Sequence, residues 1–361
     1  MSKTPWNSIA EGVIPLAEGR LTFPEALVSP CASCQTAPCC THLPLHTFKI
    51  TNMIELDHAL YLLNFDRIVL GLSASGEWSV YYAYPCRHLN RQDFTCTVHN
   101  SPAQPQICIT YNPYHCWYKR VLTQSVSDDF LQIDRPRLEH LITRIVFDEF
   151  RNVVEVPDWN TMIEELANLP LQPALPPSEP TPTDAVTEDW QAMLLNLESS
   201  PAQTEEIYTY EALRDPCDGC QAHCCQTLVF PQALPRSITN LDFLKFCLGF
   251  PGVELGIADD VWSLVVKTTC RHLQNNRCSV YGRPERPLLC KYYDAWKCTY
   301  KINFGLPRPA GFLRVKFEQF NWLTDCFQFD QHGAIVQFPP TEVIRTYLED
   351  QWRTVLTQPA A

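Results

Sequence analysis

The sequence CDGCQAHCC occupies residues 217–225, and a closely related sequence, CASCQTAPCC, occupies residues 31–40. Each stretch opens with two cysteines that are two residues apart, and each closes with an adjacent cysteine pair. Each also begins a longer series of eight cysteines, so that the two series contain 16 of the 18 cysteines in the chain. A thiol-rich pattern that occurs twice predicts that sulfur atoms converge in each half, either on a metal or in disulfides.

The two series keep the same order and nearly the same spacing. In both, the tetrapeptide C-R-H-L follows the opening cysteines, and identical intervals of eleven and seven residues separate the last three cysteines. Other positions recur too, since Ile50-Thr51-Asn52 matches Ile238-Thr239-Asn240 and Trp78-Ser79 matches Trp262-Ser263. We therefore predict that a whole folded unit is duplicated. The first series is Cys31, Cys34, Cys39, Cys40, Cys86, Cys96, Cys108 and Cys116, and the second is Cys217, Cys220, Cys224, Cys225, Cys270, Cys278, Cys290 and Cys298.

Length and proline content predict the domain organisation. A chain of 361 residues is typical of about two domains. Six of the thirteen residues in 170–182 are proline, and proline favours an extended, stiff linker. The predicted fold class is α+β, α-rich with long irregular cysteine-bearing segments, arranged as two homologous metal-stapled units. The predicted parts are an N-terminal extension (1–22), a first cysteine-cluster unit (23–169), a Pro-rich linker (170–204) and a second cysteine-cluster unit with a C-terminal helix (205–361).

Charge and hydropathy exclude some partners. The net charge of −12 disfavours binding to nucleic acid phosphates, which calls for a basic face. No stretch reaches the ~18–20 apolar residues of a membrane span, and no secretory signal pattern is visible. The sequence thus predicts a cytoplasmic protein without nucleic acid or membrane partners, and a protein partner stays unidentified. In a reducing compartment, clustered cysteines are usually metal ligands or catalytic groups.

Three chemistries compete for the cysteines. A CxxC pair places two sulfurs at a separation that suits one metal ion, but the second CxxC of a zinc ribbon is absent from each series. An adjacent pair stands there instead, and adjacent side chains tend to diverge. An iron–sulfur cluster, [4Fe–4S], takes four thiolates from irregular spacings, so we favour it, with zinc as the alternative cofactor and disulfides as the third. All sixteen cysteines are predicted metal ligands, whereas Cys247 and Cys326 fit small buried hydrophobes.

Other polar residues give weaker signals. His88 and His272 of C-R-H-L are either metal ligands or hydrogen-bond donors to a thiolate or a carbonyl. Asp57 and Asp242 are isolated carboxylates, for which solvated or capping roles fit better than catalysis. The glycine-rich nucleotide loops and the HExxH zinc motif do not occur, so no catalytic residue is predicted and enzymatic activity stays open.

The second series resembles a known family. Its motifs, in order, are CxxCxxxCC, C-x-x-L, C-x-[IV]-Y and R-P-x-x-C-[RK]-x-Y. This order resembles that of the zinc- or iron-chelating cysteine-cluster family of the YkgJ type. The family includes proteins named flagellin N-methylase. The resemblance covers roughly residues 217–298 and implies metal chelation. The first series departs from the pattern at His99, Gln104 and Ile109, where the second has Tyr281, Arg286 and Lys291.

The cysteine pattern and the resemblance together predict a metal-binding protein, iron–sulfur in type, with a redox, metal-handling or scaffolding role. The resemblance also implies an alternative, a methylase-like enzyme related to flagellin N-methylase. A zinc-stapled protein-interaction module is the third interpretation.

Overall fold

The computed structural model describes residues 37–111, 116, 118, 122, 126–127, 129–171, 221–258, 261–306 and 308–357. We refer to residues 37–171 as the first half and to residues 221–357 as the second half. The predicted N-terminal extension and most of the predicted linker lie outside the described residues, so the domain boundaries stay predictions. The same holds for four predicted ligands: Cys31, Cys34, Cys217 and Cys220.

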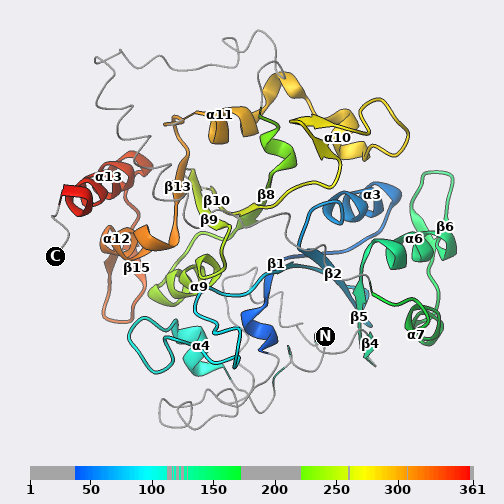
Figure 1. Ribbon diagram of the computed structural model, residues 1–361, viewed down its shortest axis with the longest axis horizontal. Coiled ribbons are helices and arrows are strands. Elements are labelled where there is room, and N and C mark those ends of the chain that lie inside the picture. The colour runs from blue at the N-terminus through cyan, green and yellow to red at the C-terminus, as the bar shows by residue number, and fades with distance from the viewer. Residues whose placement is uncertain are drawn as a thin grey trace.

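The first half forms an antiparallel sheet of five strands in the order β1-β3-β2-β5-β4 (Figure 1). Its hairpin β2–β3 is rich in β-branched and aromatic residues, which pack well on a pleated surface, and most of its side chains are buried. The strands are β1 (His42–Phe48), β2 (Ile68–Ser73), β3 (Trp78–Ala83), β4 (Val126–Ser127) and β5 (Phe130–Ile133).

The second half forms an antiparallel sheet whose order, β13-β9-β10-β8, repeats four strands of the first. Strands β8, β10, β9 and β13 take the places of β1, β3, β2 and β5. A Cβ atom on Gly256 would lie 2.9 Å from the Phe312 ring, and one on Gly71 would overlap the Phe130 ring in the same way. The two sheets thus share a packing detail that requires glycine. The strands are β8 (Thr227–Gln232), β9 (Val253–Ala258), β10 (Val261–Lys267) and β13 (Leu313–Val315).

A helix links the first two sheet strands of each half: α3 (Met53–Leu62) in the first and α9 (Ile238–Leu248) in the second. The side chain of Asn52 caps α3, and that of Ser237 caps α9, each by accepting backbone N–H bonds of the first turn. These caps align Asn52 with Ser237. The repeated Ile-Thr-Asn tripeptides therefore do not occupy equivalent positions, because Ile50 precedes the cap whereas Ile238 begins the helix.

Each half ends in the same succession of a helical segment, a two-stranded hairpin and a final helix. The predicted C-terminal helix is present as the last of these. In the first half the elements are α6 (Arg135–Arg144), β6 (Val146–Phe147), β7 (Val153–Glu155) and α7 (Trp159–Ala167). In the second they are η7 (Phe317–Gln319), α12 (Phe320–Asp325), β14 (Gln328–Phe329), β15 (Ile335–Gln337) and α13 (Thr341–Thr357).

One hydrophobic core runs through both halves. The halves also exchange backbone hydrogen bonds where the end of each long helix meets the C-R-H-L segment of the other half. Arg87 N donates to Gly249 O at 2.8 Å, and Arg271 N donates to Asn64 O at 2.8 Å. The two sheets are therefore packed around a shared core.

The secondary-structure content confirms the predicted α+β class and corrects one part of it. Among the described residues, 36% are helical and 27% lie in strands, so the expectation of an α-rich fold is wrong. The reason lies in β2 and β9, whose apolar runs are short and almost continuous. Periodicity does not separate such a run from a buried helix. No helix in the described part of the chain is long and apolar enough to cross a membrane.

Candidate metal centres

The adjacent cysteine pairs lie in matching turns. The 3-10 turns η2 (Pro38–Cys40) and η5 (His223–Cys225) follow Ala37 and Ala222, whose φ angles of 37° and 58° are in the left-handed region. Each turn places its pair at the start of β1 or β8. The expectation that adjacent side chains diverge is wrong in both halves, because Cys39 Sγ and Cys40 Sγ are 3.9 Å apart and a hydrogen bond joins the Cys224 and Cys225 side chains.

The C-R-H-L segments join these turns through one backbone hydrogen bond in each half. Cys86 N donates to Cys40 O at 2.7 Å, and Cys270 N donates to Cys225 O at 2.8 Å. The segment therefore brings its own cysteine next to the pair, although 45 residues separate Cys40 from Cys86 in the sequence.

The next cysteine of each series pairs back onto the same segment. In the second half, β11 (Leu273–Gln274) and β12 (Arg277–Cys278) form a hairpin in which Leu273 faces Cys278. In the first half, Leu89 and Cys96 form the equivalent isolated bridge. Cys96 and Cys278 thus reach the C-R-H-L cysteines by the same route.

The third element is a short helix that the other half caps. Cys108 lies in α4 (Gln106–Thr110) and Cys290 in α10 (Leu288–Tyr292), and neither helix has a side-chain cap of its own. Asp57 of α3 accepts the Leu288 N–H bond at 2.6 Å, and Asp242 of α9 accepts the Ile107 N–H bond at 3.1 Å.

This exchange is reciprocal. The helix α3 of the first half packs on α10 of the second, and α9 of the second packs on α4 of the first (Figure 1). Burial raises the pKa of Asp57 and of Asp242, and the backbone donors oppose that rise. Both aspartates therefore have the capping role that the sequence favoured, but the helix that each one caps belongs to the opposite half.

Mutual electrostatic effects show which thiols lie together. Burial raises the pKa of Cys108 well above its usual value, and Cys39, Cys86 and Cys96 raise it further. We define these four residues as the first thiol cluster. Asp242, which caps the helix of Cys108, raises the pKa of that cysteine as well.

The second thiol cluster comprises five cysteines: Cys224, Cys225, Cys270, Cys278 and Cys290. Burial raises the pKa of Cys290 to about 12, Arg286 lowers it, and Cys270, Cys224 and Cys278 raise it. The Cys225 thiol donates a hydrogen bond to Cys224, which lowers the pKa of Cys224 to about 7 and raises that of Cys225. Arg286 also lowers the pKa of Cys224, so its guanidinium faces the second thiol cluster.

The remaining cysteines have other surroundings. Cys298 is buried and interacts with Tyr293. The pKa of Tyr293 is raised by burial and by the Cys298 side chain. Cys247 is fully buried in α9, and Cys326 Sγ donates to Trp322 O at 3.5 Å. Cys247 and Cys326, which belong to neither cysteine series, therefore pack as small side chains, as predicted. Cys116 is partly buried.

Both C-R-H-L histidines have an unsatisfied ring nitrogen. Within the described part of the chain, the Nε2 atoms of His88 and His272 are buried and have no hydrogen-bond partner. Burial lowers the pKa of both histidines, so the rings are neutral at neutral pH. A buried imidazole nitrogen usually finds a proton donor, a proton acceptor or a metal.

The donor set fits a soft metal. Each cluster contains several thiols, and a C-R-H-L histidine with a buried Nε2 atom stands two residues after one of its cysteines. Thiolate ligands select zinc and iron–sulfur clusters. In the described residues, however, no group of three or more histidine, cysteine or carboxylate side chains is arranged to hold a single metal ion. Within the described part of the chain, no disulfide joins any of the fourteen described cysteines to another. The CxxC cysteines predicted to complete each ligand set lie outside the described ranges.

Comparisons with protein-family models, with curated proteins and with solved structures gave no match. The resemblance to the YkgJ-type family therefore stays a prediction from the motifs.

Two features of these sites were missed from the sequence. The cross-capping by Asp57 and Asp242 joins residues that are 231 and 135 positions apart. The only sequence signal was that the two aspartates stand at matched positions in the apolar segments 56–65 and 241–250. The second missed feature is the neighbourhood of Arg286, whose guanidinium acts on the second thiol cluster.

Proposed function

We propose that this chain is a metal-binding cysteine-cluster protein built from two homologous units, with one metal centre at each thiol cluster. The matched convergence of the cysteines carries the proposal. In both halves a left-handed residue, one backbone hydrogen bond and one cross-strand bridge bring the same cysteines together. Because the cysteine positions and the backbone hydrogen bonds beside them occur in both halves, we infer that both sets of cysteines have the same function.

We favour an iron–sulfur cluster of the [4Fe–4S] type at each centre. The described thiols of each cluster lie within electrostatic reach of one another. An iron–sulfur cluster spreads its thiolate ligands over several irons, and it tolerates irregular spacing. The ligands would come from Cys39, Cys40, Cys86, Cys96 and Cys108 in the first half, from the second thiol cluster in the other, and from the CxxC cysteines.

When bound, an iron–sulfur cluster supplies one-electron redox chemistry. The residues of the chain would bury the thiolates, and Arg286 would offset part of their charge in the second half. We propose a redox, metal-handling or scaffolding role in a reducing compartment such as the cytoplasm.

Zinc is the second candidate metal, and a specific observation favours it. The orphaned Nε2 atoms of His88 and His272 occur at the same place in both halves. Imidazole nitrogen is a common zinc ligand, and mixed cysteine–histidine sets are frequent at structural zinc sites. A zinc-bound form would make the protein a metal-stapled interaction module.

Anaerobic purification followed by iron, zinc and acid-labile sulfide analysis tests the proposal. We expect iron and sulfide in comparable amounts and a broad visible absorption band. A colourless protein with stoichiometric zinc would replace the iron–sulfur assignment by the zinc module. Protein that binds neither metal after anaerobic reconstitution, while it remains folded, would refute the metal-binding function.

A further inference from the structure

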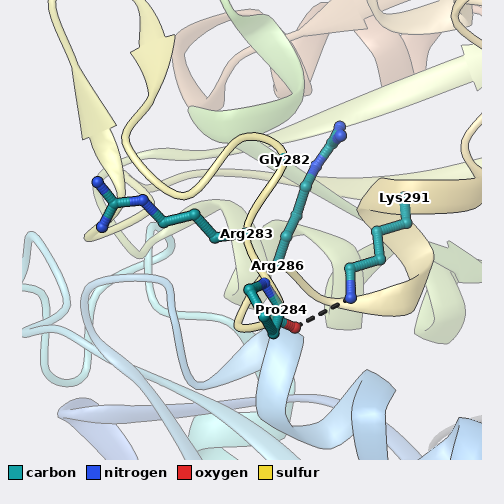
Figure 2. A pocket seen from close by; sticks show the side chains of 5 residues that line it. All are labelled: Gly282, Arg283, Pro284, Arg286 and Lys291. Atoms are coloured by element: carbon teal, nitrogen blue, oxygen red, sulfur yellow. Dashed lines mark hydrogen bonds between the residues drawn. The ribbon is translucent and has the colours of Figure 1, made fainter.

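A cavity of about 400 Å³ lies beside the second thiol cluster. It is lined by the loop between β12 and α10 and by Lys291 in the last turn of α10 (Figure 2). This volume lies within the range of small-molecule sites. The lining residues are Gly282, Arg283, Pro284, Arg286 and Lys291.

The lining is cationic. Three of its five residues are arginine or lysine, and none is acidic. In Figure 2 the side chains of Arg286 and Lys291 lie on one side of the loop with their charged ends pointing in opposite directions, whereas Arg283 extends from the other side of the loop. Lys291 Nζ donates to Pro284 O at 2.9 Å, which holds the ammonium at one end of the cavity.

Arg286 has hydrogen-bonding capacity to spare. Its guanidinium stacks on the Tyr281 ring, 4.3 Å from the ring centroid, which fixes the plane of the fork. Its Nε atom is buried and has no hydrogen-bond partner among the described residues. Neither Arg283 nor Arg286 forms an ion pair within that part of the chain. In a protein of net charge −12, such unpaired cations concentrate a positive potential that attracts anions.

The first half provides an internal comparison for this pocket. Its loop has the same length and the same turns, since Ser101 N and Arg283 N donate to Val98 O and Val280 O at 3.1 and 3.0 Å. Ser101, Gln104 and Ile109 stand where the second half has Arg283, Arg286 and Lys291.

Two side chains of the first half are buried against their own loop. Gln104 is buried and accepts the Asn100 N–H bond at 2.7 Å, and Ile109 is buried too. The cationic lining is therefore not a requirement of the shared backbone.

We propose that this pocket binds a ligand with a phosphoryl group. Arginine matches a tetrahedral oxyanion with two parallel N–H bonds, and lysine adds a compact positive charge. Inorganic phosphate and a phosphomonoester share that chemistry, and the volume leaves room for the organic part of an ester. The inference does not depend on the metal at the second thiol cluster, so its failure would leave the metal proposal intact.

Isothermal titration of the full-length, metal-loaded protein with inorganic phosphate and with phenyl phosphate, at constant ionic strength, tests the proposal. We expect saturable binding of at least one of the two at one site per chain. Arg286→Gln and Lys291→Ile, which install the residues of the first half, should each weaken binding about tenfold or more, because each removes a charge-assisted contact. The control Lys297→Gln alters an exposed lysine outside the pocket and should leave the affinity unchanged.

Phosphate that saturates the site identifies the free anion as a sufficient ligand, whereas binding of phenyl phosphate alone identifies the ester. Thermal unfolding checks that each variant is folded, and if Arg286→Gln is not, Lys291→Ile still decides. Absence of saturable binding to the wild-type protein overturns the proposal. So does an affinity that a folded pocket variant leaves unchanged.

Discussion

The two sheets have the same strand order but different charges at one place. In the second half, buried Glu254 on β9 bonds to Arg314 on β13 at 2.6 Å and to Lys267 on β10 at 3.0 Å. The matching positions of the first half hold Val69, Gln132 and Ala83. The same backbone therefore accepts either an apolar contact or a buried ion network, which shows that the network is not needed to form the sheet.

The comparison extends to the loops beside the thiol clusters. Gln104 of the first half accepts a backbone hydrogen bond from Asn100 in its own loop. Arg286 of the second half faces sulfur atoms and a cavity instead. The sulfur positions are shared by the two halves, and the charged surroundings belong to the second. If one half has a specialised activity, we expect it in the second.

The largest effect should come from breaking the Glu254 network on one side only. Arg314→Gln leaves the buried carboxylate with a single partner and should lower the free energy of unfolding by about 3 kcal/mol. The triple variant Glu254→Val, Lys267→Ala, Arg314→Gln copies the first half and should stay within about 1 kcal/mol of the wild type. Urea unfolding measures both, and a triple variant as unstable as the single one would contradict the equivalence of the sheets.

The same network predicts a pH dependence. Burial raises the pKa of Glu254, but Arg314 and Lys267 outweigh burial and lower it to about 2. Because the folded pKa lies below the unfolded one, this stability is complete above about pH 4.5 and is lost as the pH falls toward about 2. The loss amounts to about 3 kcal/mol. Urea unfolding at about pH 5 and pH 3 should show that the free energy of unfolding falls more for the wild type than for the triple variant. Equal decreases in the two proteins would contradict the role of Glu254.

The exchanged caps should give a smaller and crossed effect. Asp57→Ala removes the cap of α10 and should lower the free energy of unfolding by about 1–2 kcal/mol. In metal-free protein, Cys290 should also react faster with a thiol reagent. Asp242→Ala should do the same for Cys108 of the opposite half. Asp158 caps α7 within its own half, so Asp158→Ala is the matched control and should leave both cysteines unchanged. Mass spectrometry of the labelled peptides shows which cysteine has reacted. Faster labelling only in the half that carries the substitution would contradict the exchange of caps between the halves.

The smallest effect concerns a surface contact between the halves. Arg87 forms an ion pair with Glu318 at 2.5 Å and stacks on Phe317, 4.1 Å from the ring centroid. Both charged side chains are partly exposed, so Glu318→Ala should cost less than about 1 kcal/mol. A larger loss in thermal unfolding would mean that this pair helps to hold the halves together.

Local sequence is consistent with local structure in several places. The apolar segments 56–65 and 241–250 overlap the helices α3 and α9, and the runs that begin at Trp78 and Trp262 lie in strands. Several of the repeated cysteines lie within electrostatic reach of one another, and the ligand role of all sixteen stays a prediction.

What the sequence could not predict is non-local. Strands β2 and β9 are nearly uniformly apolar, so no alternation distinguishes them from helices. Caps normally lie within three residues of the N–H bond they accept, and no spacing rule points from Asp57 to Leu288. The cavity at Arg286 depends on side chains left unpaired by folding, which composition does not reveal.

The central claim, two matched metal centres, is tested most directly by counting metal and sulfide per chain in single-cysteine variants purified anaerobically. Cys108→Ser and Cys290→Ser should each lose about half of the metal of the wild type, because each variant impairs one thiol cluster. Cys326→Ala, outside the repeat, should lose none. Folded Cys108→Ser and Cys290→Ser proteins that both retain the full wild-type content would contradict the account.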